Sequence, residues 1–355
     1  MKLSISKIFK PLSMAVLFLG LTSTSLFAQT KKDFKLSWTV YVGNMPLLYA
    51  QEYGILDKWA KKYGINIELV QVNDYIEQIN QYTAGEFDAA LMTNMDSLTI
   101  PAASGVDTTI VTVQDFSNGN DGIILKGKNK LEDIKGQNVN LVELSVSHYL
   151  LARALDSVGL KEKDIKVVNT SDADIVSAYM SKDLTSLVTW NPQLSQIKNL
   201  KDAHLVFDSS NIPGEIIDSI VVNTDILKDN PNFAKALAGA WYEAASIINN
   251  RDKESLAFIA KKSGTDINGI NQQLNSTKLF FDPKEGLSFI QSNELINTMK
   301  KISEFSFEKG ILGEGASNAE FIGIEFPNKK YYGNKSNIKL RFDDTYTKEA
   351  AEGKL

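Results

Sequence analysis

Between residues 36 and 92 the chain alternates short apolar runs with helical patterns, and this alternation restricts the fold more than any other feature. Three strand-like runs at 36–42, 65–72 and 87–92 are separated by two segments whose apolar residues recur at helical spacing. Glycines and a proline mark the ends of these segments. The order β-α-β-α-β is most simply satisfied by a parallel sheet with right-handed crossovers. We therefore expect an α/β fold.

Polar and aromatic side chains follow each of these three strands. In a parallel sheet the carboxyl ends of the strands lie along one edge, so such side chains can converge on one small molecule. A second interpretation is that Trp38 belongs to the core and that Asp74 and Asp96 only cap the helices that follow. The candidate ligand-binding residues from this part of the chain are Trp38, Tyr41, Asn44, Asp74, Thr93, Asn94 and Asp96.

A second β/α unit supplies the other candidates. The run at 115–122 is too polar for a simple turn, and we interpret it as a crossing between two lobes, with a surface loop as the alternative. The strand at 139–144 leads through two serines into a helix, an arrangement that can hold an anion or a polar group. Either serine can instead be a plain N-cap. The candidates here are Asn120, Asp121, Glu143, Ser145, Ser147, His148, Trp190 and Glu215.

The last third of the chain reads as helical. After a return strand at 219–223, apolar residues recur at helical spacing in 231–249, 253–262, 266–274 and 287–310. We expect these helices to pack on the first lobe. The segment from residue 327 onward is rich in Lys and Tyr, and we expect it to be a polar, loosely held tail.

The N-terminus and the composition limit the class of protein. Three Lys, an apolar stretch and a small residue at Ala28 predict a secretory signal over residues 1–28, so we expect a soluble protein exported across the inner membrane to the periplasm. The chain has no Cys, which excludes disulfides and thiolate metal sites. The formal net charge is −5 and no basic patch is interleaved with aromatic residues, so nucleic acid is not an expected partner.

Several of these segments resemble the periplasmic solute-binding proteins of ABC importers, in particular the nitrate, sulfonate and taurine group, also described as NMT1/THI5-like. The likeness covers roughly residues 34–262. It is carried by Gly-Asn-Met-Pro-Leu-Leu-Tyr-Ala at 43–50, Gly-Glu-Phe-Asp-Ala-Ala at 85–90, Leu-Glu-Asp-Ile-Lys-Gly at 131–136 and Ser-His-Tyr-Leu-Leu at 147–151.

The resemblance implies a two-lobed periplasmic-binding-protein fold of type II, with parallel-rich sheets flanked by helices and a ligand cleft between the lobes. Lobe 1 would comprise 29–118 and 222–345, lobe 2 would comprise 119–221, and 346–355 would be a polar tail. The hinge strands would lie near 115–123 and 220–224. It further implies a monomer without a cofactor that delivers a small-molecule ligand to a membrane permease and, indirectly, to its ATPase.

The candidate residues favour a cationic or nitrogen-rich ligand. Carboxylates and aromatic faces suit a cation, and no Arg or Lys falls in these motifs. The segments 93–96, 117–122 and 212–216 resemble a branch that binds urea- or guanidine-type compounds. We therefore expect guanidinium, urea or an amine. A sulfonate or nitrate held by Ser145, Ser147 and helix N-termini is the alternative.

Two other functions remain open at this point. One alternative is a THI5-like protein of the same fold, either a pyrimidine-related binding protein or an enzyme such as a pyrimidine synthase. The synthases carry a cysteine-rich motif that this chain lacks, and His148 and His204 have no catalytic motif around them. We therefore expect no enzymatic activity. A subunit that senses a ligand for a membrane receptor would use the same cleft.

Overall fold

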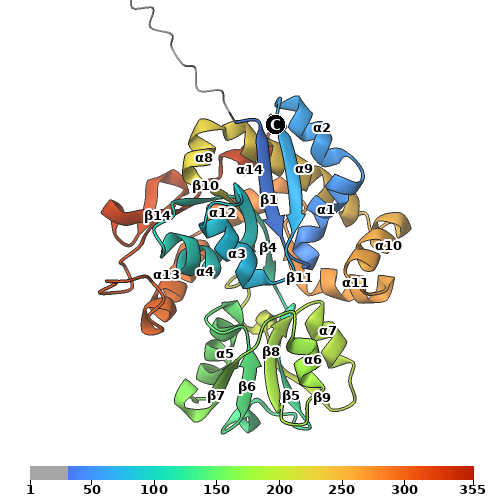
Figure 1. Ribbon diagram of the computed structural model, residues 1–355, viewed down its shortest axis with the longest axis vertical. Helices are drawn as coiled ribbons and strands as arrows, with labels where there is room; N and C mark the ends of the chain where they lie inside the picture. Colours follow the sequence, from blue (N-terminus) through green and yellow to red (C-terminus); the bar gives the residue numbers. More distant parts are fainter. Residues whose placement is uncertain (1–30) are drawn as a thin grey trace, which may run out of the picture. The chain divides into compact units, whose positions relative to one another are not determined.

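Two β-sheets organise the part of the chain that this computed structural model describes, residues 31–355 (Figure 1). The predicted secretory signal at 1–28 lies outside the described residues. Sheet A contains β1 (Asp33–Trp38), β2 (Asn66–Gln71), β3 (Ala89–Thr93), β4 (Thr108–Ser117), β10 (Ile217–Asn223), β11 (Thr277–Leu279), β12 (Gly323–Phe326), β13 (Lys330–Tyr332) and β14 (Ile338–Phe342). Sheet B contains β5 (Asp121–Lys126), β6 (Asn138–Leu141), β7 (Lys166–Asn169), β8 (Ser186–Trp190) and β9 (Ala203–Asp208).

The predicted β-α-β-α-β unit forms one side of sheet A. Strand β1 lies between β2 and β3 and is parallel to both, as the sequence predicts. Strand β10 then runs antiparallel between β3 and β4. The helices of this unit are α1 (Met45–Glu52), α2 (Ile55–Lys62), α3 (Tyr75–Thr83) and the short α4 (Asn94–Ser97).

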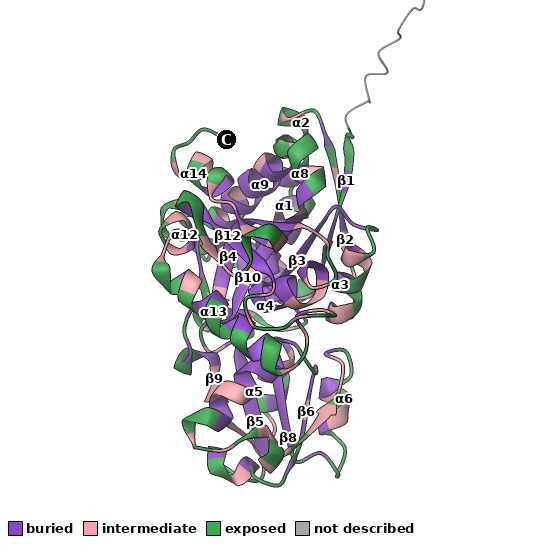
Figure 2. Cartoon of the chain, turned by 90° about the vertical axis from the view of Figure 1, so that its left-hand side faces the viewer, coloured by how far each residue is buried: buried purple, intermediate pink, exposed green. Residues whose placement is uncertain are grey.

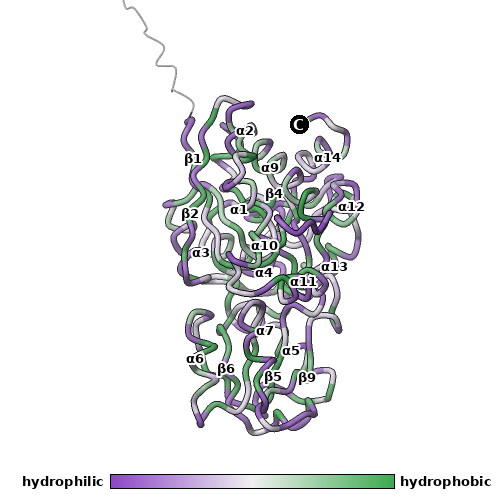
Figure 3. The backbone as a smooth tube through the Cα atoms, turned by 90° about the vertical axis from the view of Figure 1, so that its right-hand side faces the viewer, coloured by the Kyte–Doolittle hydropathy of each residue, from purple (hydrophilic) through white to green (hydrophobic). Residues whose placement is uncertain are grey.

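Sheet B has the strand order β7-β6-β8-β5-β9. Strand β6 is parallel to β7 and β8, whereas β5 is antiparallel to β8 and β9. Figure 1 shows its helices around this sheet: α5 (Val146–Ser157), α6 (Ile175–Tyr179) and α7 (Gln193–Lys198). In Figure 3, a hydrophobic stretch runs along β5, while hydrophilic stretches occupy many of the loops between elements.

The core of the sheet A region is built around α9 (Pro231–Asn249). Pro231 occupies the first helical turn, where its missing N–H costs nothing. Phe233, Leu237 and Trp241 recur at helical spacing and are fully buried. Figure 2 shows that much of α9 is buried. A Cβ at Gly239 would stand 2.5 Å from the Trp59 ring of α2, so only glycine allows this close approach of α9 to α2.

The remaining helices are α8 (Thr224–Asp229), α10 (Lys253–Lys262), α11 (Ile267–Asn275), α12 (Pro283–Ile290), α13 (Asn293–Glu308) and α14 (Thr345–Ala351). The predicted helices at 231–249 and 253–262 have the observed bounds. The single helix predicted at 287–310 is wrong. The chain breaks after Ile290, and the Ser292 hydroxyl accepts a hydrogen bond from the Leu295 N–H to begin α13.

Two further predictions are corrected. The segment after residue 327 is not loosely held, because β14 pairs in parallel with β4 and buries Leu340 and Phe342. Within 346–355, helix α14 buries Tyr346. The return to sheet A comes earlier than residue 222, since β10 pairs with β4 from Ile217 onward. No helix in residues 31–355 has the length and apolar character needed to cross a membrane.

Candidate functional site

Residues from both sheets enclose a cavity of about 30 Å³. By the space that one enclosed water needs, this volume holds only a few water-sized atoms. Several lining residues stand at a strand end or directly follow a strand, among them Thr39, Thr93 and Trp190. The lining residues are Thr39, Tyr41, Asn44, Tyr75, Leu91, Thr93, Asp121, Val146, Trp190, Ile216 and Asp218.

The segment after β1 contributes one wall. The Asn44 side-chain amide donates a hydrogen bond of 3.0 Å to the Thr39 carbonyl, which closes the turn before α1. The Tyr41 hydroxyl donates a hydrogen bond of 2.7 Å to Oδ1 of Asp115 on β4. A Cβ on Gly43 would lie 2.0 Å from Asp115 Oδ2, so the glycine leaves room for this carboxyl group.

Asp218 contributes to a second wall, and Asp115 lies behind it on the neighbouring strand. They are directly opposite each other in the antiparallel register of β4 and β10. Burial and the charge of Asp218 raise the pKa of Asp115. Burial and the charge of Asp121 raise the pKa of Asp218 to about 8. Like charges placed opposite each other are unfavourable, so this pair needs a proton or a cation between its carboxyl groups.

Asp121 stands where the chain passes from sheet A to sheet B. The Ser117 hydroxyl donates a hydrogen bond of 2.5 Å to Asp121 Oδ2, and a second buried hydroxyl, that of Ser209, lies 2.6 Å from the Ser117 oxygen. Burial nevertheless raises the pKa of Asp121 to about 6. A carboxylate with this little solvation binds a cationic partner more strongly than an exposed one would.

Thr93, Asp96 and Tyr75 form a connected group at the end of β3. The sequence predicts Asp96 as the helix N-cap, which is wrong: Thr93 is the N-cap of α4, and Asp96 lies in the first turn. The hydroxyl groups of Tyr75 and Thr93 both donate to Asp96 Oδ2, at 2.8 and 2.7 Å. Asp96 therefore orients two lining residues from behind the cavity wall, and burial raises its pKa to about 6.

Replacing Asp96 by alanine is expected to lower the free energy of unfolding by about 2 kcal/mol, because two buried hydroxyl groups lose their shared acceptor. Asp96→Asn keeps an acceptor oxygen and should lose less. The measurement is urea unfolding of both variants beside the wild type. Equal stability of the alanine variant and the wild type would contradict this role.

Aromatic side chains meet at the cavity from the two sheets. The Tyr75 ring of α3 and the Trp190 ring of β8 are arranged edge to face, with centroids 5.7 Å apart. The Tyr75 backbone N–H also donates to Asp172 Oδ1, at 3.3 Å. These contacts join the sheet A side of the cavity to the sheet B side.

The cavity is acidic. Its lining includes no Lys, Arg or His, while the carboxyl groups of Asp121 and Asp218 belong to it. Within residues 31–355, no group of three or more His, Asp or Glu side chains is arranged to hold a metal ion.

Five of the residues predicted from the sequence line the cavity: Tyr41, Asn44, Thr93, Asp121 and Trp190. The other ten do not. These are Trp38, Asp74, Asn94, Asp96, Asn120, Glu143, Ser145, Ser147, His148 and Glu215.

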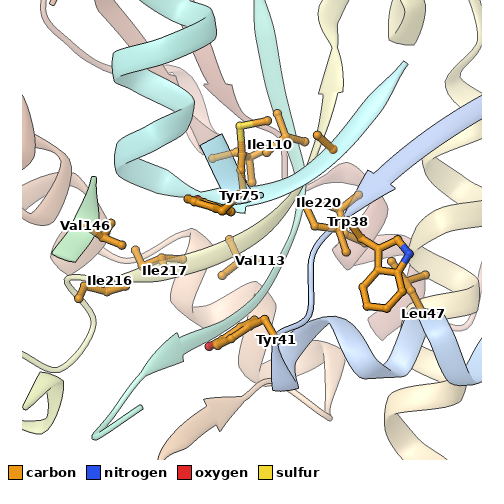
Figure 4. Packing of buried hydrophobic residues seen from close by; sticks show 14 of the residues in the cluster. Trp38, Tyr41, Leu47, Tyr75, Ile110, Val113, Val146, Ile216, Ile217 and Ile220 are labelled. Atoms are coloured by element: carbon orange, nitrogen blue, oxygen red, sulfur yellow. The ribbon is translucent and has the colours of Figure 1, made fainter. Parts of the chain in front are cut away.

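Several of these ten have structural contacts of their own. Trp38 is buried in the hydrophobic core, and in Figure 4 its ring points away from Tyr75 and toward Leu47. Asp74 caps α3, and Ser145 caps α5. Trp38 is therefore a core residue, and Asp74 and Ser145 are helix caps, as the alternative interpretations predict.

The other predicted residues that do not line the cavity make polar contacts, are buried in a helix or lie at the surface. The Asn94 amide bridges the Glu215 carbonyl and the Ile217 N–H, and the Asn120 Oδ1 accepts from Asn191. Glu143 is exposed, whereas Ser147 and His148 are buried in α5. Burial lowers the pKa of His148 to about 4, so this side chain is neutral at pH 7.

Glu215 forms ion pairs with two basic residues. Arg153 donates to both of its carboxylate oxygens, at 2.9 and 3.2 Å, and Lys301 donates at 2.6 Å. The Tyr149 hydroxyl adds a fourth hydrogen bond of 2.6 Å. Burial alone would raise the pKa of Glu215, but these hydrogen bonds lower it below its usual value.

Sequence reasoning left several lining residues out of the binding set. Asp218 and Tyr75 carry a recognisable signal, since both are polar residues near a strand end. Leu91, Val146 and Ile216 are ordinary apolar residues, and nothing in their local sequence distinguishes them from the core. Figure 4 shows Val146 and Ile216 among the buried hydrophobic residues near Tyr75.

Comparisons with known proteins agree on a fold. The chain is 22% identical over 216 residues to the taurine-binding periplasmic protein of Escherichia coli (strain K12), which covers 58% of this chain and 67% of that protein. It is 22% identical over 251 residues to an aliphatic sulfonates-binding protein of the same organism, covering 69% and 77%.

A solved structure supports the same conclusion. The alkanesulfonate-binding protein SsuA from Xanthomonas axonopodis pv. citri, bound to MOPS, superposes with a TM-score of 0.68 and 16% identity, covering 80% of this chain and 96% of that one. The predicted two-lobed, type II periplasmic-binding-protein fold is thereby confirmed. Residues 28–262 match the family model of the NMT1-like family, which is more than half of the chain. The protein therefore belongs to the NMT1-like family.

Proposed function

We propose that this protein is the extracytoplasmic solute-binding subunit of an ABC importer and that its solute is a small, planar, nitrogen-rich cation such as guanidinium. The observation that carries the proposal is a cavity lined by Asp121 and Asp218 with no basic residue in its lining. Family membership and the periplasmic-binding-protein fold support the transport role, and the cavity chemistry supports the class of solute.

The electrostatics favour a positive charge in the cavity. Buried carboxylates without a counter-charge are costly, and the pKa values of Asp96, Asp121 and Asp218 are all raised by burial. A cation between these groups offsets their desolvation. A guanidinium ion can also donate two parallel hydrogen bonds to one carboxylate, the strong geometry for such pairs.

The aromatic residues and the volume narrow the solute further. Tyr41, Tyr75 and Trp190 contribute ring surface to the lining, and ring faces attract cations. The cavity of about 30 Å³ matches a compact planar molecule such as guanidinium or urea better than the longer taurine molecule. Guanidinium combines a positive charge with a compact planar shape.

A sulfonate or nitrate is the second candidate, because relatives of this chain are named for taurine and aliphatic sulfonates. The predicted anion contacts do not line the cavity: the Ser145 hydroxyl accepts from the Ser147 N–H, and Ser147 is buried in α5. An anion in this cavity would face Asp121 and Asp218. The acidic lining therefore favours the cation.

The test is a thermal-shift panel on the mature protein with guanidinium, methylamine, urea, taurine and nitrate. A solute that binds only the folded state, at about a hundred times its dissociation constant, stabilises the protein by roughly 2.7 kcal/mol. We expect a shift with guanidinium, a smaller one with methylamine and urea, and none with taurine or nitrate. A shift with taurine or nitrate alone would overturn the proposed solute.

A further inference from the structure

Asp115 is a buried carboxyl group next to the cavity that plays no part in the proposed contacts with the solute. Tyr41 donates to its Oδ1, while its Oδ2 has no hydrogen-bond partner among residues 31–355. A Cβ on Gly43 would lie 2.0 Å from Oδ2, so the glycine leaves room for this oxygen, and Asp218 lies opposite on β10. The side chain is thus fixed beside Asp218 by the strand register and by the residues around it.

Weakly acidic groups from several elements surround this carboxyl pair. The titratable groups that act on the pair are Asp121 from β5, Asp96 from α4, Tyr41 from the segment after β1 and Tyr75 from α3. All are acids or phenols. With the cavity empty, two adjacent ionised carboxylates in this setting are unfavourable, so one proton lies between them at neutral pH.

We propose that Asp115 and Asp218 share one proton in the empty site and that an entering cation displaces it, so that the pair selects cations over neutral molecules of the same shape. This inference rests on the proposed function. One proton leaves to the solvent for each cation bound, and the net charge of the site stays constant. The raised pKa of Asp218, about 8, is consistent with this exchange.

The exchange makes selectivity depend on pH. Releasing one proton per cation means that affinity for guanidinium rises about tenfold per pH unit while the pair is still protonated in the empty protein. Urea brings no charge and cannot replace the proton, so its affinity stays flat. The ratio of guanidinium to urea affinity should therefore increase between pH 6 and pH 8.

Isothermal titration of guanidinium chloride at pH 7 in phosphate and in Tris tests this directly, because the two buffers take up a proton with different enthalpies. We expect about one proton released per cation in the wild type. The same titration at pH 9, above the Asp218 pKa of about 8, should release almost no proton, because the pair is then ionised before the cation enters. The exposed Glu143→Gln is the matched control and should behave as wild type.

The outcomes separate this inference from the proposed function. Guanidinium binding with the same enthalpy in both buffers would overturn proton exchange and leave the cation-binding function standing. No guanidinium binding would overturn both. The shared proton can also be tested in the ligand-free protein, by recording the carbon-13 NMR spectrum of the aspartate carboxyl groups at pH 7. The spectrum should show a protonated signal that disappears when the pH is raised to 9, and a spectrum at pH 7 without that signal would overturn the shared proton.

Discussion

Replacing Asp218 by asparagine is expected to stabilise the ligand-free protein at pH 8.5 by about 2 kcal/mol and to abolish measurable guanidinium binding. The variant removes a buried carboxyl group that borders the cavity and faces Asp115. An amide needs no counter-charge, so the folded state no longer bears the cost of ionising this position. The same carboxylate is the cation's expected partner, so stability and binding change in opposite directions.

The sign follows from proton linkage. Asp218 has a folded pKa of about 8, above the ordinary value of 3.8, so the folded protein holds a proton that the unfolded chain has lost. Stability therefore falls as pH rises toward 8, by at most about 1.4 kcal/mol per pH unit. His148, with a pKa lowered to about 4, acts in the opposite direction only below its ordinary 6.5. The window from pH 6.5 to 8.5 is thus the one to measure.

The measurement is urea unfolding of the ligand-free wild type and the variant at pH 6.5 and 8.5. We expect the wild type to lose stability over this interval and Asp218→Asn to lose less. Asp225→Asn, at an exposed position on α8, is the control and should follow the wild type. A destabilised Asp218→Asn variant at pH 8.5 would contradict the assignment of Asp218 as an unfavourably buried carboxyl.

The strand ends around the cavity could be predicted because each carries a local signal. Tyr41, Thr93 and Trp190 are polar or aromatic residues at the end of an apolar run, and the edge of a parallel sheet brings such positions together. Parallel order itself followed from alternating strand and helix patterns. These are short-range features, and the structure confirms the elements that they describe.

The carboxyl pair could not be predicted in the same way. Asp115 and Asp218 are brought together by the register of β4 with β10, two strands far apart in the sequence. A one-residue slip would turn either side chain to the other face of the sheet, so periodicity alone cannot pair them. β14 was not predicted because it also depends on pairing with a strand that is distant in the sequence. Its apolar residues are buried only because β14 lies beside β4, and the polar residues around it gave no local sign of this.

Glu215 is a carboxylate near the cavity, as predicted, but it forms ion pairs instead of lining the cavity. Its position in the loop before β10 favours a place in the site, and the neighbouring Ile216 does line the cavity. The partners that neutralise Glu215 are Arg153 on α5 and Lys301 on α13, each distant in sequence. The sequence alone does not show these partners, so it predicts that the Glu215 carboxylate contacts the ligand.

Glu215→Ala is expected to lower the free energy of unfolding at pH 7 by about 3 kcal/mol, because removing one partner of a buried ion pair leaves the others uncompensated. The Tyr149 hydroxyl is the most affected, since its residue is 1% exposed. Arg153 and Lys301 have side chains that are 34% and 50% exposed and can turn toward water, which keeps the loss below the upper end for buried pairs. Urea unfolding measures the change.

The pH dependence and a matched control make this prediction specific. The folded pKa of Glu215 is lowered, so its stabilisation is present above the unfolded value near 4.5 and is lost as pH falls through the folded pKa. The gap between Glu215→Ala and wild type should therefore shrink in acid. Glu285→Ala breaks an exposed pair with Lys278 and should cost under about 1 kcal/mol.

Guanidinium affinity decides which of the two interpretations of Glu215 holds. Because Glu215 does not line the cavity and its charge is already neutralised, its removal should change the dissociation constant by less than about tenfold, while Asp218→Asn abolishes binding. If a folded Glu215→Ala protein loses binding as completely as Asp218→Asn does, then Glu215 contacts the solute. The role predicted from the sequence would then replace the structural one.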